Sequence, residues 1–254
     1  MSLEIIGVIH VLPLPGTPHG IYSLQEVLDR AVFDAQQLQK GGVRTAVIEN
    51  FGDAPFVRGS VEPHVVSMLT LIAHTIVRET GLSLGINVLR NDAISALAIA
   101  STCNARFIRV NVHIGSAWTD QGLIQGEAYN TLQYRKKLGL QTDIAADIMV
   151  KHAAPAGERP LVDQAKDCLG RGGASHVIVT GASTGSSVNW QHLRLIRDAI
   201  PNASIWIGSG LQPSVVEQAK DWANAAIVGT YFHEDAQLDK PLSLQRIEEI
   251  LSKV

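Results

Sequence analysis

The chain has 254 residues, of which 46% are hydrophobic and 18% charged, and its formal net charge is −3. This composition allows a large buried core and excludes an intrinsically disordered chain. The slightly acidic balance argues against a nucleic-acid-binding protein, which needs a basic face. No apolar run approaches the roughly 18 to 20 residues of a membrane-spanning helix, so we expect no transmembrane segment.

The beginning of the sequence does not resemble a secretion signal. The apolar run from Ile5 to Leu14 contains His10 and Pro13 and lacks a basic leader. The two cysteines, Cys103 and Cys168, are too few for a disulfide framework. These features indicate a reducing compartment, and we expect a cytoplasmic protein.

Eight short apolar runs, rich in valine and isoleucine, alternate with amphipathic runs of helical periodicity. Apolar runs with little polar alternation are typical of parallel strands that are buried on both faces. The expected strands are Ile5–Val11, Thr45–Glu49, Leu84–Val88, Phe107–Asn111, Thr142–Asp147, His176–Thr180, Ile205–Gly208 and Ala226–Gly229. The expected helices are Leu24–Lys40, Pro63–Thr80, Asp92–Thr102, Glu127–Leu138, Leu161–Arg171, Trp190–Ala199, Pro213–Trp222 and Ser243–Lys253.

This alternation predicts an α/β fold, a (β/α)8 TIM barrel that forms a single domain over residues 1–254. A doubly wound open sheet is the main alternative. Several connections that follow a strand are long, whereas those that follow a helix are short. Because the strand-end loops of such a barrel carry its active site, we interpret the long loops as a functional face, with a merely variable surface as the alternative. The long loops are Leu12–Ser23, Asn50–Glu62, Val112–Gly126 and Ile148–Pro160.

Polar residues stand at the ends of several otherwise apolar strands. An unpaired buried polar group costs about 1–3 kcal/mol, so each of these side chains needs a partner in the protein, in water or in a ligand. Any one of them alone fits a structural hydrogen bond equally well. Their convergence at one end of a barrel favours a ligand site, and the candidates are Asn50, Asn87, Asn111, Thr180 and Gly181.

Four residues at or just after strand ends are candidates for catalysis. Glu49 is the predicted general base, because a carboxylate at a partly dry barrel mouth can have its pKa raised. Asp147 is its expected acid or orienting partner from across the barrel. His10 can donate or accept a proton near neutral pH, and Lys151 could neutralise a phosphate or a developing oxyanion. A buried structural histidine and a solvated loop lysine are the alternatives.

The sequence contains no motif of a metal or cofactor site. Metal ligands at HxH, HExxH or CxxC spacing are absent, so His10, Glu49 and Asp147 could bind a metal only by converging through the fold. The Walker A motif, the dinucleotide-binding glycine fingerprint and the nucleophile elbow are also absent. We therefore expect no metal and no cofactor.

The stretch from Ser204 to Phe232 contains two buried strands that each end at a glycine-containing turn. In a (β/α)8 barrel, the turns after the seventh and eighth strands often bind a phosphate through backbone amides. The alternative is that these glycines only allow tight turns. We predict the anion site at Gly208, Ser209, Gly210, Gly229 and Thr230.

Several ordered motifs along nearly the whole chain resemble the BtpA/SgcQ family. They are Gly7–Gly16, Glu49–Asp53 with Pro55 and Phe56, Gly85–Asp92, Phe107–Val112, Asp147–His152, Thr180–Gly185 and Val228–Thr230. The resemblance implies a TIM barrel of the ribulose-phosphate-binding type. The family takes its name from an extrinsic thylakoid protein needed for photosystem I biogenesis, and other members are assigned as nucleosidases.

Two functions follow from the residues and the resemblance together. The first is an enzyme that acts on a small phosphorylated ligand, a sugar phosphate or a nucleoside- or nucleotide-like compound, as an isomerase, a lyase or a nucleosidase-like hydrolase. The second is a non-catalytic assembly factor for photosystem I, with thylakoid association only in a photosynthetic source. The sequence shows no basic amphipathic helix or lipid anchor for that contact. A homo-oligomer is compatible with the sequence, although no residue argues for it.

Overall fold

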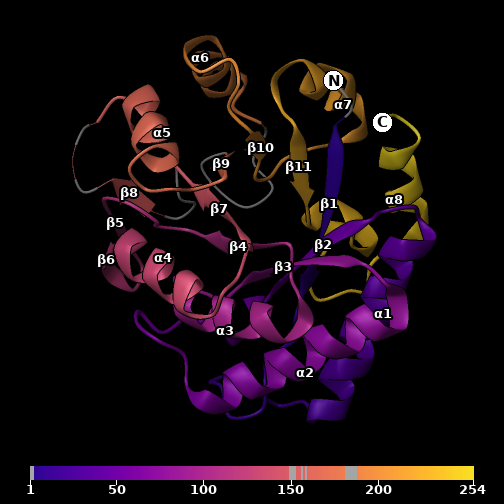
Figure 1. Ribbon diagram of the computed structural model, residues 1–254. Coiled ribbons are helices and arrows are strands. Elements are labelled where there is room, and N and C mark those ends of the chain that lie inside the picture. Colours follow the sequence, from indigo (N-terminus) through magenta and orange to yellow (C-terminus); the bar gives the residue numbers. More distant parts are fainter. Residues whose placement is uncertain (1–2, 149–152, 156, 158, 181–187) are drawn as a thin grey trace.

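Eight parallel strands close into a barrel in the computed structural model, which describes residues 3–148, 153–155, 157, 159–180 and 188–254 (Figure 1). The order around the barrel is β1-β11-β10-β9-β7-β4-β3-β2, and β2 pairs with β1 to close the ring. The predicted (β/α)8 barrel is confirmed, and the open doubly wound sheet is wrong. The barrel strands are β1 (Glu4–His10), β2 (Thr45–Glu49), β3 (Ser83–Asn87), β4 (Phe107–Val110), β7 (Asp143–Asp147), β9 (His176–Val179), β10 (Ile205–Ile207) and β11 (Ala225–Val228).

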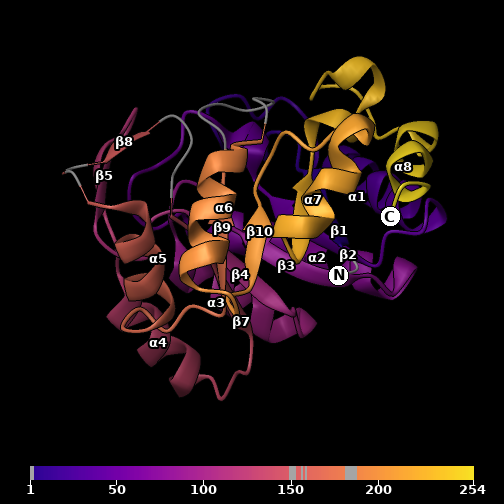
Figure 2. The ribbon, with the colours of Figure 1, turned by 90° about the horizontal axis from the view of Figure 1, so that it is seen from above.

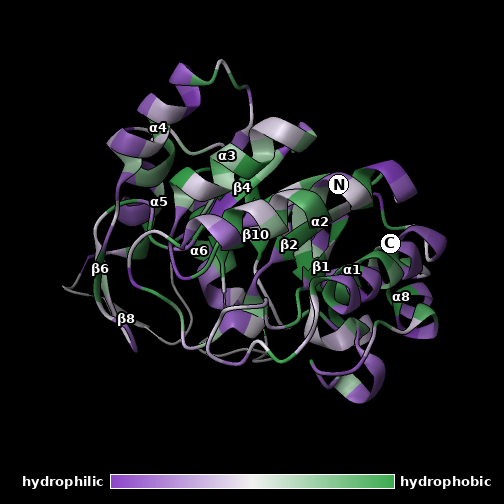
Figure 3. Ribbon diagram, turned by 90° about the horizontal axis from the view of Figure 1, so that it is seen from below, coloured by the Kyte–Doolittle hydropathy of each residue, from purple (hydrophilic) through white to green (hydrophobic). Residues whose placement is uncertain are grey.

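The helices surround this ring and turn their hydrophilic faces outward (Figures 1 and 3). They are α1 (Leu24–Lys40), α2 (Pro63–Thr80), α3 (Ala93–Cys103), α4 (Ala128–Lys137), α5 (Leu161–Leu169), α6 (Trp190–Ala199), α7 (Val216–Trp222) and α8 (Leu244–Leu251). Short 3-10 turns lie at η1 (Phe51–Asp53), η2 (Pro213–Val215), η3 (Thr230–Phe232) and η4 (Glu234–Ala236). Within the described residues, no helix is both long and apolar enough to span a membrane.

Helix α1 shows how local sequence sets an element. Ser23 stands at its N-cap, where the hydroxyl accepts a hydrogen bond from the amide of Glu26 and the Glu26 carboxylate accepts one from the amide of Ser23. This capping box satisfies two amides that have no partner inside the helix. From there, Val27, Ala31 and Leu38 place a buried stripe against the barrel at helical spacing.

The side chains inside the barrel form layers, because successive residues of a strand alternate between its two faces. An apolar middle layer fills the centre. It consists of Ile6, Val8, Val47, Phe107, Ala145, Ile178, Trp206, Ala225 and Ile227. Two residues further along, the same inward positions reach the carboxyl ends of the strands at His10, Glu49, Arg109, Asp147, Thr180 and Gly229. The polar strand ends of the sequence are therefore the uppermost interior layer of one barrel.

Two of the long loops contain strands that the sequence analysis did not predict. β5 (Ser116–Thr119) and β6 (Gly122–Gln125) form an antiparallel hairpin, and β8 (Ala153–Pro155) pairs with the other edge of β5. This small sheet lies at the side of the barrel near α4 and α5 (Figures 1 and 2). Strands of three or four residues carry little periodicity of their own, and β8 comes from a different loop. This sheet forms only because the two loops pack against each other in the folded protein.

Replacing Gly85 by alanine should destabilise the barrel. A Cβ atom at Gly85 would lie 2.1 Å from the ring of Phe107, which is fully buried in the middle layer. Overpacking a core costs about 1–3 kcal/mol, and we expect Gly85→Ala to lower the free energy of unfolding by that amount in urea titrations. Gly59→Ala is the matched control, because a Cβ atom there meets nothing within 4 Å. Equal stability of the two variants would contradict this packing.

Candidate active site

A cavity of about 280 Å³ opens at the carboxyl ends of the barrel strands. Its wall includes the ends of β1, β2, β10 and β11 together with a side chain from the middle of β4 and one from α8. The residues that line it are Val8, His10, Glu49, Arg109, Gly208, Ser209, Gly210, Leu211, Gln212, Ile227, Val228, Gly229, Thr230, Tyr231, Ala236 and Arg246. His10, Glu49 and all five residues of the predicted anion site thus share one cavity.

Arg109 lines this cavity and was not predicted from the sequence. Its Nη1 donates to Oε1 of Glu49 at 2.9 Å, its Nε donates to Oδ2 of Asp147 at 3.0 Å, and its Nη2 donates to Oδ1 of Asp147 at 3.2 Å. Burial alone would lower the pKa of Arg109, but the charges and hydrogen bonds of the two carboxylates outweigh it and raise the pKa above its usual value. A single arginine in the apolar run Phe107–Val110 is a signal for such a partner, because a buried charge must be paired.

Two asparagine amides complete this cluster. Asn87 Nδ2 donates to Oε1 of Glu49 at 3.0 Å, and Asn111 Nδ2 donates to Oδ2 of Asp147 at 2.9 Å. Neither asparagine lines the cavity; both lie behind the carboxylates. The Oδ1 atom of Asn111 is buried and has no hydrogen-bond partner among the described residues. The predicted convergence of Asn87 and Asn111 with Glu49 and Asp147 is therefore present, and the amides fix the carboxylates from behind.

His10 ends β1 and lies next to Glu49 in the register of β1 and β2. Its Nδ1 lies 2.9 Å from Nε2 of His233, and its ring meets Phe51 edge-on at a centroid distance of 4.9 Å. His233 is fully buried, and its Nδ1 donates to the carbonyl oxygen of Lys240 at 2.5 Å. The sequence analysis missed His233, which follows the eighth strand by only a few residues but has no distinctive motif.

The other end of the cavity is built mainly from backbone. The amides of Ser209, Gly210 and Leu211 donate to no acceptor in the described part of the chain, and Gly210 has a φ of +82°. The Ser209 hydroxyl is buried and has no partner among the described atoms. Successive unpaired amides in a turn form a concavity that binds anions.

Arg246 of α8 adds a cation to the wall of the cavity. Its Nε donates to the carbonyl oxygen of Tyr231 at 2.5 Å, and its guanidinium carbon lies 4.4 Å from the centre of the Tyr231 ring. Within the described residues it has no ion-pair partner. Arg246 was missed because helix α8 is expected to cover the outside of the barrel, and only closure between its first and last units brings α8 beside the cavity.

Two glycines of the predicted anion site also make room for neighbouring side chains. A Cβ atom at Gly208 would lie 2.1 Å from Cγ2 of Thr180, and one at Gly229 would lie 2.7 Å from Cε1 of His10. Thr180 is buried and does not line the cavity; it packs behind Gly208. Packing alone therefore requires glycine at both positions, whatever the cavity binds.

The remaining predicted residues lie elsewhere. Asn50 uses both ends of its side chain inside the protein, since Oδ1 accepts from the amide of Leu89 at 2.7 Å and Nδ2 donates to Asp53 at 3.0 Å. It lines a separate cavity of about 320 Å³ between the loops after β1 and β2. Gly181 and Lys151 lie outside the described residues. Among the residues that the structure describes, no group of three or more His, Cys, Asp or Glu side chains is placed to hold a metal ion.

The whole chain matches a known protein family. The model of the BtpA family matches residues 1–254. The Photosystem I biogenesis protein BtpA of Synechocystis sp. is 41% identical over 97% of this chain and 86% of its own length. An uncharacterised protein of Pyrococcus abyssi is 39% identical over 100% of this chain and 96% of its own, and an uncharacterised mitochondrial protein of Caenorhabditis elegans is 30% identical over 98% and 92%.

Solved structures share the fold at low sequence identity. Phosphoribosyl anthranilate isomerase from Thermus thermophilus superposes with a TM-score of 0.57 at 7% identity, over 99% of this chain and 98% of that one. Orotidine 5'-phosphate decarboxylase from Pyrococcus horikoshii superposes with a TM-score of 0.58 at 14% identity, over 98% of both chains. At these identities the similarity shows the barrel fold alone.

Replacing Arg109 by leucine should destabilise the protein strongly, because Glu49 and Asp147 then stay buried without their cation. Removing one partner of a buried ion pair costs about 3–5 kcal/mol, and we expect a loss of that size in the free energy of unfolding. The triple variant Arg109→Leu, Glu49→Gln, Asp147→Asn removes the charges together and should recover most of the loss. Chemical denaturation followed by tryptophan fluorescence measures each variant.

Arg194→Leu is the control for this series. Arg194 pairs with Asp198 on α6, where the two side chains are 71% and 64% exposed. Exposed pairs contribute about 0–1 kcal/mol, so this variant should remain close to the wild type. If Arg109→Leu loses no more stability than Arg194→Leu, the buried cluster does not carry the charges described for it.

Proposed function

This chain belongs to the BtpA family, and we propose that it is an enzyme that binds a small phosphorylated ligand in the cavity at the carboxyl ends of its barrel strands. One observation carries the proposal. The cavity joins an end where the amides of residues 209–211 have no acceptor among the described residues to a polar end with His10, Glu49 and Arg109, and Arg246 lines the same wall. A ligand with a phosphate at one end and hydroxyl or carbonyl groups at the other complements both ends.

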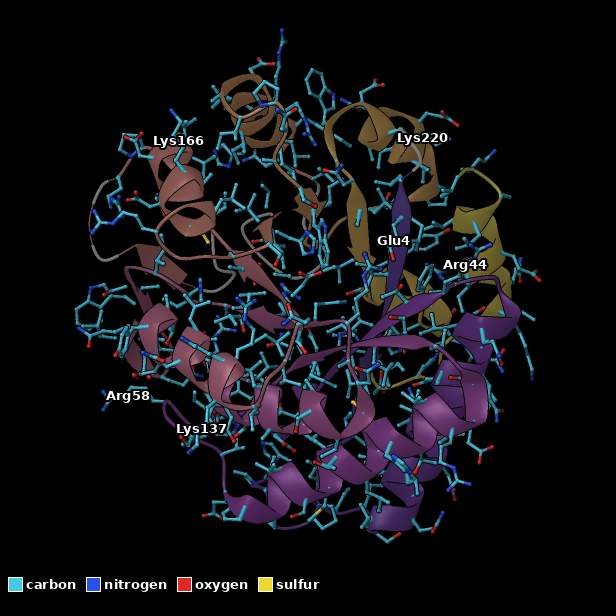
Figure 4. The ribbon with its side chains drawn as sticks, viewed as in Figure 1. Glu4, Arg44, Arg58, Lys137, Lys166 and Lys220 are labelled. Atoms are coloured by element: carbon cyan, nitrogen blue, oxygen red, sulfur yellow. The ribbon has the colours of Figure 1, made fainter. Side chains whose placement is uncertain are left out.

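The anion end favours phosphate through both geometry and charge. Three successive amides from 209 to 211 and the buried hydroxyl of Ser209 supply hydrogen-bond donors that have no other described acceptor. Arg246 supplies positive charge and a planar donor set, which suits phosphate oxygens. The labelled surface cations Lys137, Lys166 and Arg58 lie at the periphery, away from the ring of strands (Figure 4). Arg246 and Arg109 therefore supply the cationic side chains in the cavity wall.

The size of the cavity favours a sugar phosphate over a nucleotide. Its volume of about 280 Å³ lies at the lower limit of the roughly 300–1,000 Å³ that is common for small-molecule sites. One face of the Tyr231 ring is already covered by the guanidinium group of Arg246, which leaves less aromatic surface on which a base could stack. The structural neighbours named for phosphoribosyl and orotidine 5'-phosphate compounds have the same fold and agree with a phosphorylated ligand.

The polar end favours proton transfer, as in an isomerase or lyase, over hydrolysis of a glycosyl bond. Glycoside hydrolysis needs one carboxylic acid that donates a proton and one carboxylate that acts as base or nucleophile. Here Arg109 donates to Oε1 of Glu49 and to both oxygens of Asp147, and protonating either carboxylate would weaken these charge-assisted hydrogen bonds. We therefore assign these carboxylates to holding Arg109 and orienting ligand hydroxyl groups. A nucleosidase-like hydrolase is the alternative within the enzyme class.

A non-catalytic role in photosystem I assembly is the second candidate, favoured by the 41% identity to the Synechocystis protein named for photosystem I biogenesis. An animal has no photosystem I, yet a relative from Caenorhabditis elegans matches 98% of this chain. A function common to these relatives must be independent of photosystem I. A metabolite-binding cavity meets that condition, which is why we place the enzyme first.

Isothermal titration calorimetry with ribose 5-phosphate, inorganic phosphate and ribose tests the anion site. We expect the two phosphate compounds to bind and ribose not to bind. Arg246→Gln removes a charge-assisted hydrogen bond worth about 1.5–3 kcal/mol, which corresponds to a loss of roughly 10- to 100-fold in affinity for ribose 5-phosphate. Lys166→Gln on α5 is the matched control and should leave the affinity unchanged.

Two results would contradict the anion site. In one, ribose binds as tightly as ribose 5-phosphate, or neither phosphate compound binds. In the other, Arg246→Gln and Lys166→Gln weaken binding equally, so that the effect reflects general electrostatics and not the cavity.

A further inference from the structure

We propose that His10 is the proton-transfer group of the cavity and that His233 is the positioning residue that fixes which nitrogen of His10 carries the proton in the neutral ring. The proton-transfer role of His10 deepens the proposed function and rests on it, because it involves the ligand. The hydrogen-bond chain itself is a property of the protein without any ligand. It runs from the carbonyl oxygen of Lys240 through His233 to His10.

The buried end of this hydrogen-bond chain, at the Lys240 carbonyl, determines which atom donates in each hydrogen bond. A carbonyl oxygen can only accept, so the 2.5 Å contact between Nδ1 of His233 and the Lys240 oxygen requires a proton on Nδ1. Arg30 of α1 donates to the same oxygen and to that of Asp239, and Asp34 accepts from the amide of Leu242 at 2.8 Å. Helix α1 thus holds the 239–242 segment, and with it the Lys240 carbonyl, in place.

The protonation state of His233 determines which atom donates in its hydrogen bond with His10. Burial is the largest influence on His233 and lowers its pKa, so the ring is neutral at physiological pH. A neutral imidazole with its proton on Nδ1 has a lone pair on Nε2, which can only accept. Nδ1 of His10, 2.9 Å away, must therefore donate the hydrogen bond between the two rings.

His10 consequently has its basic nitrogen on the cavity side. With the proton held on Nδ1, the lone pair of the neutral ring is on Nε2. The Cε1–Nε2 edge lies against Gly229, where only the absence of a side chain leaves space for it. Gly229 also borders the anion end of the cavity. A ligand anchored there by its phosphate presents its neighbouring carbon or hydroxyl group to Nε2.

The proton-transfer step needs no further reactant. Nε2 of His10 takes a proton from a C–H or O–H group of the ligand, and the electron pair of that bond stays on the ligand. The imidazolium still donates to His233 through Nδ1, and it returns the proton from Nε2 to another atom of the ligand. No electron is gained or lost, which agrees with an isomerisation or a reversible elimination.

Among the residues that the structure describes, the charged and titratable groups around His10 come from four elements. Glu49 neighbours it on β2, Arg109 enters the same cavity from β4, Arg246 enters from α8, and His233 lies beyond the end of β11. Arg109 forms ion pairs with Glu49 and Asp147, and burial lowers the pKa of His233. Protonation of His10 removes neither of these two ion pairs, in contrast to protonation of Glu49 or Asp147.

NMR of the histidine ring nitrogens, in the full chain without ligand, tests the proposal. In the wild type we expect neutral His10 with its proton on Nδ1 and, as the pH is lowered, proton uptake at Nε2 of His10 before His233 is protonated. His233→Leu removes the acceptor, so the proton of neutral His10 should move at least partly to Nε2. Backbone amide spectra verify that each variant is folded.

His233→Gln is the conservative counterpart. Its amide nitrogen can donate to the Lys240 oxygen while its amide oxygen accepts from Nδ1 of His10, and the wild-type tautomer should be retained. A purely structural role of His233 would not separate the leucine and glutamine variants in this way.

A neutral His10 that carries its proton on Nε2 in the wild type would overturn the proposal. So would protonation of His233 before His10, or an unchanged tautomer in folded His233→Leu. None of these readouts depends on the binding of a phosphate, so they are independent of the calorimetric test of the anion site.

Discussion

The buried guanidinium of Arg109 is the constraint on which the upper layer of the barrel depends. The residue lies two positions beyond Phe107 on β4, so the alternation that puts the phenyl ring in the apolar middle layer also points the arginine inward. A cation there must be neutralised, and β2 and β7 each end in the carboxylate that does so, Glu49 and Asp147. Asn87 and Asn111 behind these carboxylates donate further hydrogen bonds to Oε1 of Glu49 and Oδ2 of Asp147. The polar cluster is thus held together by the cost of leaving any one of its members unpaired.

This constraint also explains which parts of the site were predictable from sequence. Strand ends are visible along the chain, because apolar runs stop at polar residues, and barrel closure brings the ends to one layer. His10, Glu49, Asp147 and the glycine turns follow from that rule alone. The ion pairs inside this layer do not follow from that rule. The partners of Arg109 lie 60 and 38 residues away in the sequence, and they meet only through the register of the closed barrel.

The residues that the sequence did not reveal have a shared physical reason. His233 and Arg246 follow the last strand, where barrel closure returns the chain to the first one. His233 contacts His10 of that first strand, and Arg246 contacts Tyr231 and reaches the cavity that His10 also lines. The bond between His10 and His233 joins positions 223 residues apart. No periodicity within the sequence records such a contact. The small sheet of β5, β6 and β8 was missed for a related reason, since its strands are too short to be recognised without their partners.

The glycines after the last two strands make room for neighbouring side chains and also belong to the turns of the predicted anion site. The sequence alone does not separate these two purposes. Gly229 is required because the ring of His10 occupies the space of its side chain, and Gly208 is required because Thr180 does the same. Their presence therefore does not by itself argue for a phosphate. The amides of residues 209–211 and the buried Ser209 hydroxyl do, because they have no partner among the residues that the structure describes. Yet the packing has a chemical consequence. Since β1 pairs with β11, the missing side chain at Gly229 lets the ring of His10 lie against it in the cavity wall, and the group proposed to move a proton lies beside a turn proposed to bind the phosphate.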